Sequence, residues 1–149
     1  MRISDMNEIQ LPNSRDMEAA LKGDAQGLAR LFLLRGLDFE KNGDVVRAID
    51  NYDTALRINP SDAEILYSRG LAFSKQGALE RAIADFDAAL HINPKYVEAL
   101  NARGNAWASK DRLDRAIEDY HAALRLNPFD LQAIKARNIV LRKIIPEWS

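Results

Sequence analysis

Four arginines recur along the chain at a fixed interval of 34 residues, and a row of guanidinium groups can bind negatively charged groups. The row consists of Arg35, Arg69, Arg103 and Arg137. A guanidinium group carries a permanent charge and five donors, so such a row binds either an anionic ligand or the chain's own carboxylates. Asp85 and Asp119 follow Arg69 and Arg103 by sixteen residues. This spacing favours ion pairs within the protein over an anion site.

Other residue types that perform catalysis or bind metals are isolated. The two histidines, His91 and His121, have no partner at the spacing of a metal site or of a base and a nucleophile. The sequence contains no glycine-rich phosphate loop and no Gly-x-Ser-x-Gly or His-Glu-x-x-His motif. We therefore expect no enzymatic activity, no cofactor and no metal site.

Three Asn-Pro pairs repeat with the same interval of 34 residues, each after a short apolar run. They are Asn59-Pro60, Asn93-Pro94 and Asn127-Pro128. A fixed period in this range is typical of a solenoid, in which copies of one supersecondary unit stack and bury each other's apolar faces. Alignment on the prolines gives three full units, residues 29–62, 63–96 and 97–130.

Each unit predicts two helices, because its apolar and small residues recur at spacings of three and four. The aligned positions of the first helix are Phe32, Leu66 and Leu100; Gly36, Gly70 and Gly104; and Phe39, Phe73 and Trp107. Those of the second helix are Ala48, Ala82 and Ala116; Tyr52, Phe86 and Tyr120; and Ala55, Ala89 and Ala123. A glycine inside a helix costs about 1 kcal/mol relative to alanine, so we attribute the glycines to close packing of helix backbones.

The ends of the predicted helices carry their own signals. Gly43 and Gly77 follow the first helix of their units, where a left-handed residue commonly ends a helix. The third unit has Asp111 at this position, and we expect it to be left-handed at some steric cost. The second helices are expected to end at the Asn-Pro pairs, with each proline opening the next helix.

These aligned positions resemble the tetratricopeptide repeat, a unit of 34 residues with a small residue in its first helix, two alanines and an aromatic residue in its second, and a closing proline. The resemblance covers residues 29–130 and continues in weaker form to about Ile145. It implies an all-α fold, a right-handed α-solenoid of helix–turn–helix repeats with a concave groove. The arginine row departs from the family pattern, which prefers leucine at that position.

Both ends of the chain differ from the repeats. Residues 131–145 begin like a fourth unit, but Asn138 replaces the glycine and no second helix follows, so we expect a capping helix and a tail of residues 146–149. Residues 1–28 match no repeat, and residues 14–22 are expected to form a short helix. This N-terminal segment could cap the first repeat, lie in the groove or contact another chain.

The composition limits the classes of partner. The chain has 149 residues, 47% of them hydrophobic, a net charge of −1 and no cysteine. The near-zero charge gives no field that attracts nucleic acid or an anionic membrane, so we expect neither as a partner. There is no apolar run long enough for a transmembrane helix, and the N-terminus lacks the pattern of a signal peptide. The absence of cysteine fits a reducing compartment, and we expect a cytoplasmic protein.

In the tetratricopeptide fold the first helix of each unit lines the groove. Carried over to this sequence, that rule implies a groove that is apolar toward the N-terminus and polar toward the C-terminus. The candidate peptide-binding residues are Leu33, Leu37, Tyr67, Leu71, Asn101, Asn105 and Lys135. The leucines and Tyr67 have no evident packing role within a unit, and exposed apolar patches mark interaction sites. The competing interpretation is that the N-terminal segment covers them.

One ligand-binding subtype of the family can be tested by residue. The carboxylate clamp holds the acidic C-terminal tail of heat-shock chaperones with lysine and asparagine in the first unit, asparagine in the second, and lysine and arginine in the third. The matching positions here are Leu33, Leu37, Ser68, Glu98 and Ala102, and none agrees. A register shifted by one unit also fails. We therefore expect no clamp activity.

The sequence thus predicts a non-catalytic protein–protein interaction module that binds a peptide or helix of a partner in its concave groove, as an adaptor, scaffold or chaperone. The alternative is a structural module that self-assembles into homo-oligomers through its terminal segments.

Overall fold

The computed structural model describes residue 15 and residues 23–148, and this part of the chain is all-α, as expected. It contains seven α-helices and one short 3₁₀ helix: α2 (Ala25–Lys41), α3 (Val45–Ile58), α4 (Ala63–Lys75), α5 (Leu79–Ile92), α6 (Val97–Ser109), α7 (Leu113–Leu126), α8 (Leu131–Ile144) and η2 (Pro146–Trp148). The short helix expected over residues 14–22 lies almost wholly outside the described residues.

Aspartates in the connecting turns begin four of the helices. Asp24, Asp44, Asp62 and Asp130 each accept a hydrogen bond from a backbone N–H in the first turn of α2, α3, α4 and α8. Such caps satisfy backbone donors that have no partner within the helix. Pro60, Pro94 and Pro128 do not open the next helices, contrary to expectation, because α4, α6 and α8 begin three residues later.

The second helices end where the sequence indicates. Asn59, Asn93 and Asn127 are the C-terminal caps of α3, α5 and α7, and their backbone N–H groups bond to Ala55, Ala89 and Ala123. The turns inside the repeats are left-handed at the expected position. The φ angle is 82° at Gly43, 75° at Gly77 and 58° at Asp111.

Each repeat folds as a helical hairpin, and its glycine lies directly against the aromatic ring of the partner helix. A Cβ atom added to Gly36 would lie 2.3 Å from the Tyr52 ring. The corresponding distances are 2.6 Å from Gly70 to Phe86 and 2.7 Å from Gly104 to Tyr120. No side chain fits in this space, so glycine is required there by packing and not by its backbone freedom.

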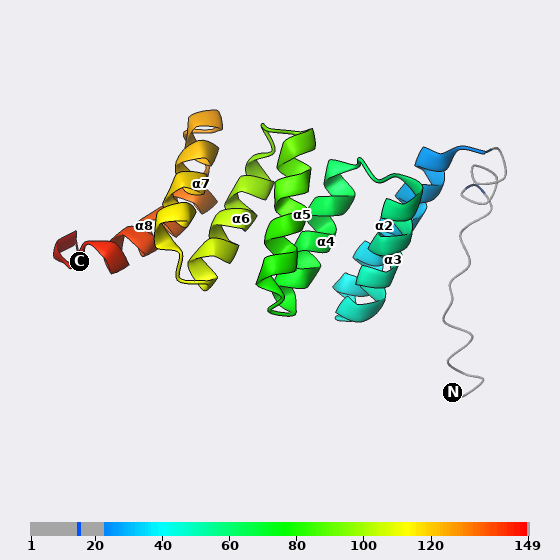
Figure 1. The fold of residues 1–149 in the computed structure, drawn as a ribbon, viewed down its shortest axis with the longest axis horizontal. Helices are drawn as coiled ribbons and strands as arrows, with labels where there is room; N and C mark the ends of the chain where they lie inside the picture. The colour runs from blue at the N-terminus through cyan, green and yellow to red at the C-terminus, as the bar shows by residue number, and fades with distance from the viewer. Residues whose placement is uncertain (1–14, 16–22, 149) are drawn as a thin grey trace.

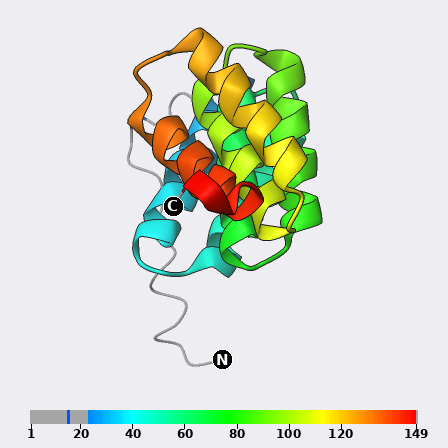
Figure 2. The same ribbon diagram turned by 90° about the vertical axis from the view of Figure 1, so that its left-hand side faces the viewer.

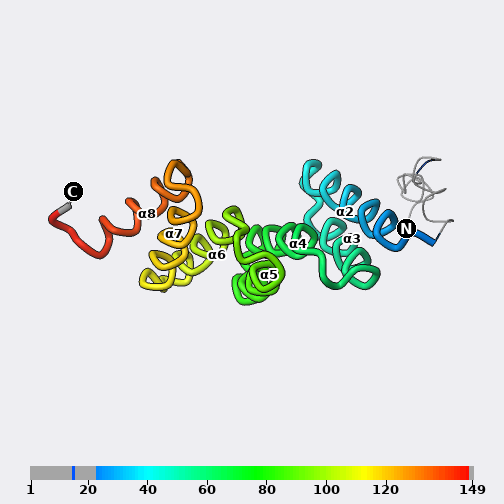
Figure 3. Tube along the Cα trace, turned by 90° about the horizontal axis from the view of Figure 1, so that it is seen from above, coloured from blue at the N-terminus to red at the C-terminus, as the bar shows by residue number. Residues whose placement is uncertain are grey.

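The hairpins α2–α3, α4–α5 and α6–α7 stand side by side in a row, with α2 and α8 at opposite ends (Figure 1). Figure 2 looks along this row with α8 nearest the viewer, and Figure 3 shows it from above. The first helices approach one another in succession, α2 to α4 to α6 to α8, with Cα atoms within 8 Å, whereas in the described chain α3, α5 and α7 do not come that close to one another. The first helices are therefore the more closely spaced layer, which is the inner side of a curved stack.

The core is divided among the interfaces between hairpins. Four clusters of buried residues follow one another along the stack, and the alanines of the second helices, Ala48, Ala82 and Ala116, are fully buried in three of them. This division is typical of a solenoid, in which each repeat contacts only its neighbours.

The left-handed turns lead to a prediction on stability. Asp111→Gly should raise the free energy of unfolding by up to about 1 kcal/mol, because glycine adopts a positive φ without the steric cost that a side chain adds. The matched change Gly77→Asp should lower it by a similar amount. Urea denaturation of both variants measures the two effects. A loss of stability in Asp111→Gly would contradict this account of the turn.

Candidate functional site

A shallow pocket of about 250 Å³ lies between the first helices α4 and α6 and is bounded by α5 and α8. It belongs to the inner layer of the stack. The residues that line it are Tyr67, Leu71 and Ser74 of α4, Leu79 of α5, Glu98, Asn101, Ala102, Asn105, Ala106 and Ser109 of α6, and Gln132 of α8. Four of the seven candidate binding residues are therefore brought together at one site.

The apolar wall of the pocket is held in place by the core. Tyr67 is half-buried, with its ring centre 5.0 Å from that of Tyr96 and 6.1 Å from that of Phe86. Burial raises the pKa of the Tyr67 hydroxyl, and the nearby charge of Glu98 raises it further. Leu71 is half-buried next to the cluster around Phe86. Tyr67 and Leu71 thus pack within the protein and also face the pocket.

The polar wall comes from α6, where Glu98, Asn101 and Asn105 follow one another at spacings of three and four and so share one helix face. The Asn101 Nδ2 donates to Asp130 Oδ2 at 2.7 Å, but the buried Asn101 Oδ1 has no donor among the described residues. The Asn105 Oδ1 accepts from the Tyr120 hydroxyl at 2.7 Å. No described acceptor receives the N–H groups of the Asn105 amide, so they are available to a ligand.

The remaining three candidate residues lie elsewhere. Leu33 is fully buried, so its expected exposure in the groove is wrong. It belongs to a core cluster that also contains Tyr52 of its own hairpin and Ile65 of the next one. Leu37 is 39% exposed and lies outside the pocket lining. Lys135 is exposed and also lies outside the lining.

One end of the pocket was not predicted from the sequence. Ser74 and Ser109 line it although neither was a candidate. Each lies a single helical turn beyond a predicted residue, Ser74 three places after Leu71 and Ser109 four places after Asn105. Extending the same face of the first helix by one turn would have found both residues.

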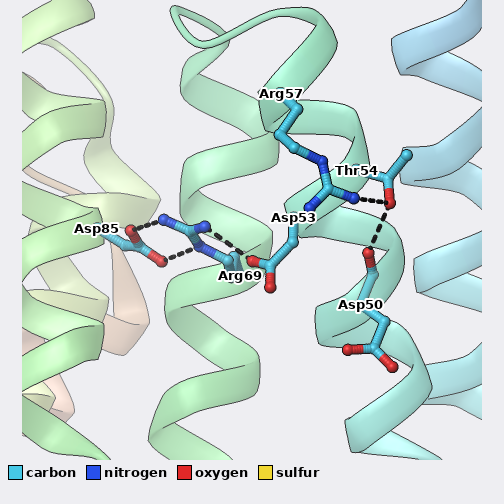
Figure 4. A network of polar contacts seen from close by, with 6 residues as sticks. All are labelled: Asp50, Asp53, Thr54, Arg57, Arg69 and Asp85. Carbon is cyan, nitrogen blue, oxygen red and sulfur yellow. Dashed lines mark hydrogen bonds and ion pairs between the residues drawn. The ribbon is translucent and has the colours of Figure 1, made fainter.

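The arginine row forms internal ion pairs, as its spacing indicates. Arg69 on α4 binds both carboxylate oxygens of Asp85 on α5, from Nε and Nη2, each at 2.8 Å. Its Nη1 binds Asp53 on α3 at 2.9 Å, so one side chain joins three helices (Figure 4). These contacts raise the pKa of Arg69 above its ordinary value, and the hydrogen bonds with Asp85 are the largest cause.

Arg103 repeats this arrangement one unit later. It binds Asp119 on α7 at 2.9 and 2.7 Å and Asp87 on α5 at 2.7 Å. A second cleft, beside Arg103 and Trp107, is lined mainly by charged residues, which include Asp87 and Asp119. The anion-binding interpretation of the row therefore fails at both middle arginines, because each is already paired with two carboxylates of the protein.

The ends of the row lack these acidic partners. The residue sixteen places after Arg35 is Asn51, and the residue sixteen places before Arg137 is His121. Arg35 lies over the ring of Phe32, with 5.7 Å from its guanidinium carbon to the ring centre. Arg137 donates to Asn138 at 3.2 Å.

Two other kinds of site are absent from the described residues. No group of three or more histidine, aspartate or glutamate side chains is arranged to hold a metal ion there. None of the described helices has the length and apolar character needed to cross a membrane.

Comparison with known proteins agrees with the fold. Two family models, each described as a tetratricopeptide repeat, match residues 33–97 and 97–130, which together exceed half of the chain. No curated protein matches the chain.

Several solved structures are similar. The tetratricopeptide domain of Arabidopsis OM64 is 27% identical, with a TM-score of 0.78 over 81% of this chain and 99% of that one. The second tetratricopeptide domain of human RPAP3, in complex with the HSP70 peptide SGPTIEEVD, is 26% identical, with a TM-score of 0.71 over 76% and 98%. The Sgt2 domain from Aspergillus fumigatus is 25% identical, with a TM-score of 0.74 over 78% of each chain.

The arginine pairs lead to a second prediction on stability. Asp85→Ala should lower the free energy of unfolding by about 3 kcal/mol, because it leaves a half-buried guanidinium without its main partner. The matched change Asp53→Ala removes the other carboxylate from the same arginine. It should cost at most about 1 kcal/mol, since the Asp53 side chain is 41% exposed and that of Asp85 only 7%. Chemical denaturation compares them, and equal costs would contradict the different roles assigned to the two aspartates.

Proposed function

Because the chain belongs to the tetratricopeptide repeat family, we propose that it is a non-catalytic protein–protein interaction module that binds a peptide segment of a partner in the pocket between α4 and α6. The observation that carries this proposal is the composition of the pocket. A half-buried apolar wall of Tyr67 and Leu71 faces amide groups of Asn101 and Asn105 that still have free hydrogen-bonding capacity. Apolar anchors beside a few convergent polar groups are the usual make-up of a ligand site.

The chemistry of the two walls suits an extended peptide. An apolar side chain of the ligand packs against Tyr67 and Leu71, because an aromatic ring gives a rigid contact area at low entropic cost. The amides of α6 bond to the ligand's backbone, since an asparagine side chain can donate and accept at once. The absence of cysteine fits a reducing compartment, so the proposal places this adaptor in the cytoplasm.

The solved neighbours support a peptide as the class of ligand. The second RPAP3 domain was solved with an HSP70 peptide, SGPTIEEVD, whose C-terminal residues are acidic. The positions that a carboxylate clamp would use are unsuited to that peptide here. Ser68 is buried and donates to the Glu64 carbonyl at 2.8 Å, while Glu98 brings a negative charge. The proposed ligand therefore needs no free carboxylate.

A second candidate function, self-association, is favoured by the apolar surface at the C-terminal end. Phe129 is 86% exposed, Leu131 66% and Ile139 57%. A second helix cannot pack on α8 as the second helices pack within the three hairpins, because Asn138 carries a side chain where a glycine admits an aromatic ring. A second copy would instead dock on these exposed residues.

The groove proposal is tested by two leucines at equivalent positions of successive repeats. Leu71→Asp should weaken binding of peptides selected from a displayed library by at least tenfold, because Leu71 lines the pocket and its burial contributes about 2 kcal/mol. Leu37→Asp is the matched control and should leave affinity unchanged. Fluorescence anisotropy measures binding, and circular dichroism checks that both variants are folded.

A second variant keeps this test decisive if Leu71→Asp unfolds. Ser109 is exposed and lines the pocket, so Ser109→Arg blocks the site without disturbing the core. Selected peptides that bind both pocket variants as tightly as the parent would show that the pocket is not the site.

Self-association makes a separate prediction for light scattering. The measured mass should exceed the 16.8 kDa of one chain and rise with concentration. The double change Phe129→Ser with Leu131→Ser should return it to that of one chain, because the exposed apolar contact is removed. A constant mass of one chain in the parent protein would end this candidate.

A further inference from the structure

The first helices carry charged or polar side chains at one equivalent position in each repeat. One of these side chains is a carboxylate without a counterion among the described residues. This position is occupied by Arg30 on α2, Glu64 on α4, Glu98 on α6 and Gln132 on α8. Arg30 and Glu64 form an ion pair, so side chains at this position on neighbouring first helices reach each other. Glu98, next in the series, has only Glu64 and the uncharged Gln132 beside it.

Glu98 therefore presents a free negative charge to the pocket. It is exposed, and no described side chain forms a hydrogen bond or ion pair with it. It is also the one charged residue among the described residues that line the pocket. Burial is the main cause of the raised pKa of the Tyr67 hydroxyl in the same pocket, and the charge of Glu98 adds to it.

A second unsatisfied acceptor lies one helical turn away. Asn101 is 6% exposed and lines the same pocket, and its Oδ1 has no protein donor among the described residues. Its Nδ2 is held by Asp130, which fixes the amide so that Oδ1 remains the free atom. A buried acceptor without a donor is unfavourable, so a ligand that supplies one gains affinity there.

We propose that the pocket selects a peptide segment bearing a lysine or arginine side chain, with Glu98 as the residue that binds the cation and Asn101 as a further acceptor. This inference rests on the proposed function and names the class of its ligand. The peptide combines an apolar residue against Tyr67 and Leu71 with a cationic residue at the α6 wall. Arginine suits the site best, because its planar group donates to a carboxylate and a neighbouring carbonyl oxygen together.

The charge of the pocket distinguishes this ligand from an acidic one. A ligand carboxylate would approach Glu98 with no cation of the lining to offset the repulsion. Because Glu98 is exposed, its ion pair with the ligand is screened by salt, so binding weakens as ionic strength rises.

The test uses the full chain and a displayed library of random eight-residue peptides with blocked ends. Enriched peptides should carry arginine or lysine together with an apolar residue. Anisotropy should show that Glu98→Gln weakens their binding about fivefold and removes most of its salt dependence. The matched control is Glu64→Gln, since Glu64 occupies the same position one repeat earlier, lies outside the pocket lining and is already paired with Arg30.

Further peptides distinguish a basic side chain from a terminal ammonium group, and a cationic ligand from an acidic one. Replacement of the selected arginine by glutamine should give the same loss as Glu98→Gln, and the two changes together should cost no more than either alone. A peptide with a free amino terminus and no basic side chain tests whether a terminal ammonium group suffices. Binding of that peptide alone, or of SGPTIEEVD as tightly as of the selected peptides, would overturn the proposal.

The outcomes distinguish this inference from the proposed function. Enriched peptides that lack a cation but lose affinity in Leu71→Asp would overturn the cation preference and leave the peptide-binding pocket standing. Failure to enrich any peptide, or binding that ignores both Leu71→Asp and Ser109→Arg, would overturn the proposed function and this inference with it.

Discussion

The close approach of a glycine to an aromatic ring inside each hairpin is the constraint on which the rest of the structure depends. Gly36, Gly70 and Gly104 let Tyr52, Phe86 and Tyr120 lie against the backbone of the first helix. This contact sets the spacing of the two helices, and the small alanines on the second helices then let the next hairpin pack closely. Because the first helices also approach one another closely, the stack curves and its inner side becomes available for binding.

The Arg–Asp pairs fix how successive hairpins are placed. Arg69 reaches a carboxylate in its own hairpin and another in the preceding one, and Arg103 does the same. The bidentate pairs with Asp85 and Asp119 lie within one hairpin and impose a definite geometry on its two helices, whereas single bonds to Asp53 and Asp87 link each hairpin to the preceding one. The guanidinium groups of Arg69 and Arg103, whose row could have bound an anionic ligand, are thus paired within the protein.

Helix α8 also shapes the pocket. Asp130 caps α8 by accepting from the backbone N–H groups of Gln132 and Ala133, and its other oxygen accepts from Asn101 on α6. The start of α8 and the polar wall of the pocket are thus held by one side chain. The polar wall is completed by Tyr120, whose hydroxyl donates to Asn105. Its two asparagines are oriented by the scaffold before any ligand arrives, which lowers the entropic cost of binding.

The sequence by itself determined the helical repeat, because small and apolar residues that recur at a strict interval are buried when helical hairpins stack on one another. It also determined the left-handed turn at Asp111 and the partners of Arg69 and Arg103, since these follow from spacing within one repeated unit. Only the tertiary structure decided which inner residues remain open. Leu33 and Tyr67 occupy equivalent positions, yet Leu33 is completely buried and Tyr67 remains half-exposed in the pocket. Burial depends on the neighbours that each repeat meets, which differ along the stack even where the spacing does not.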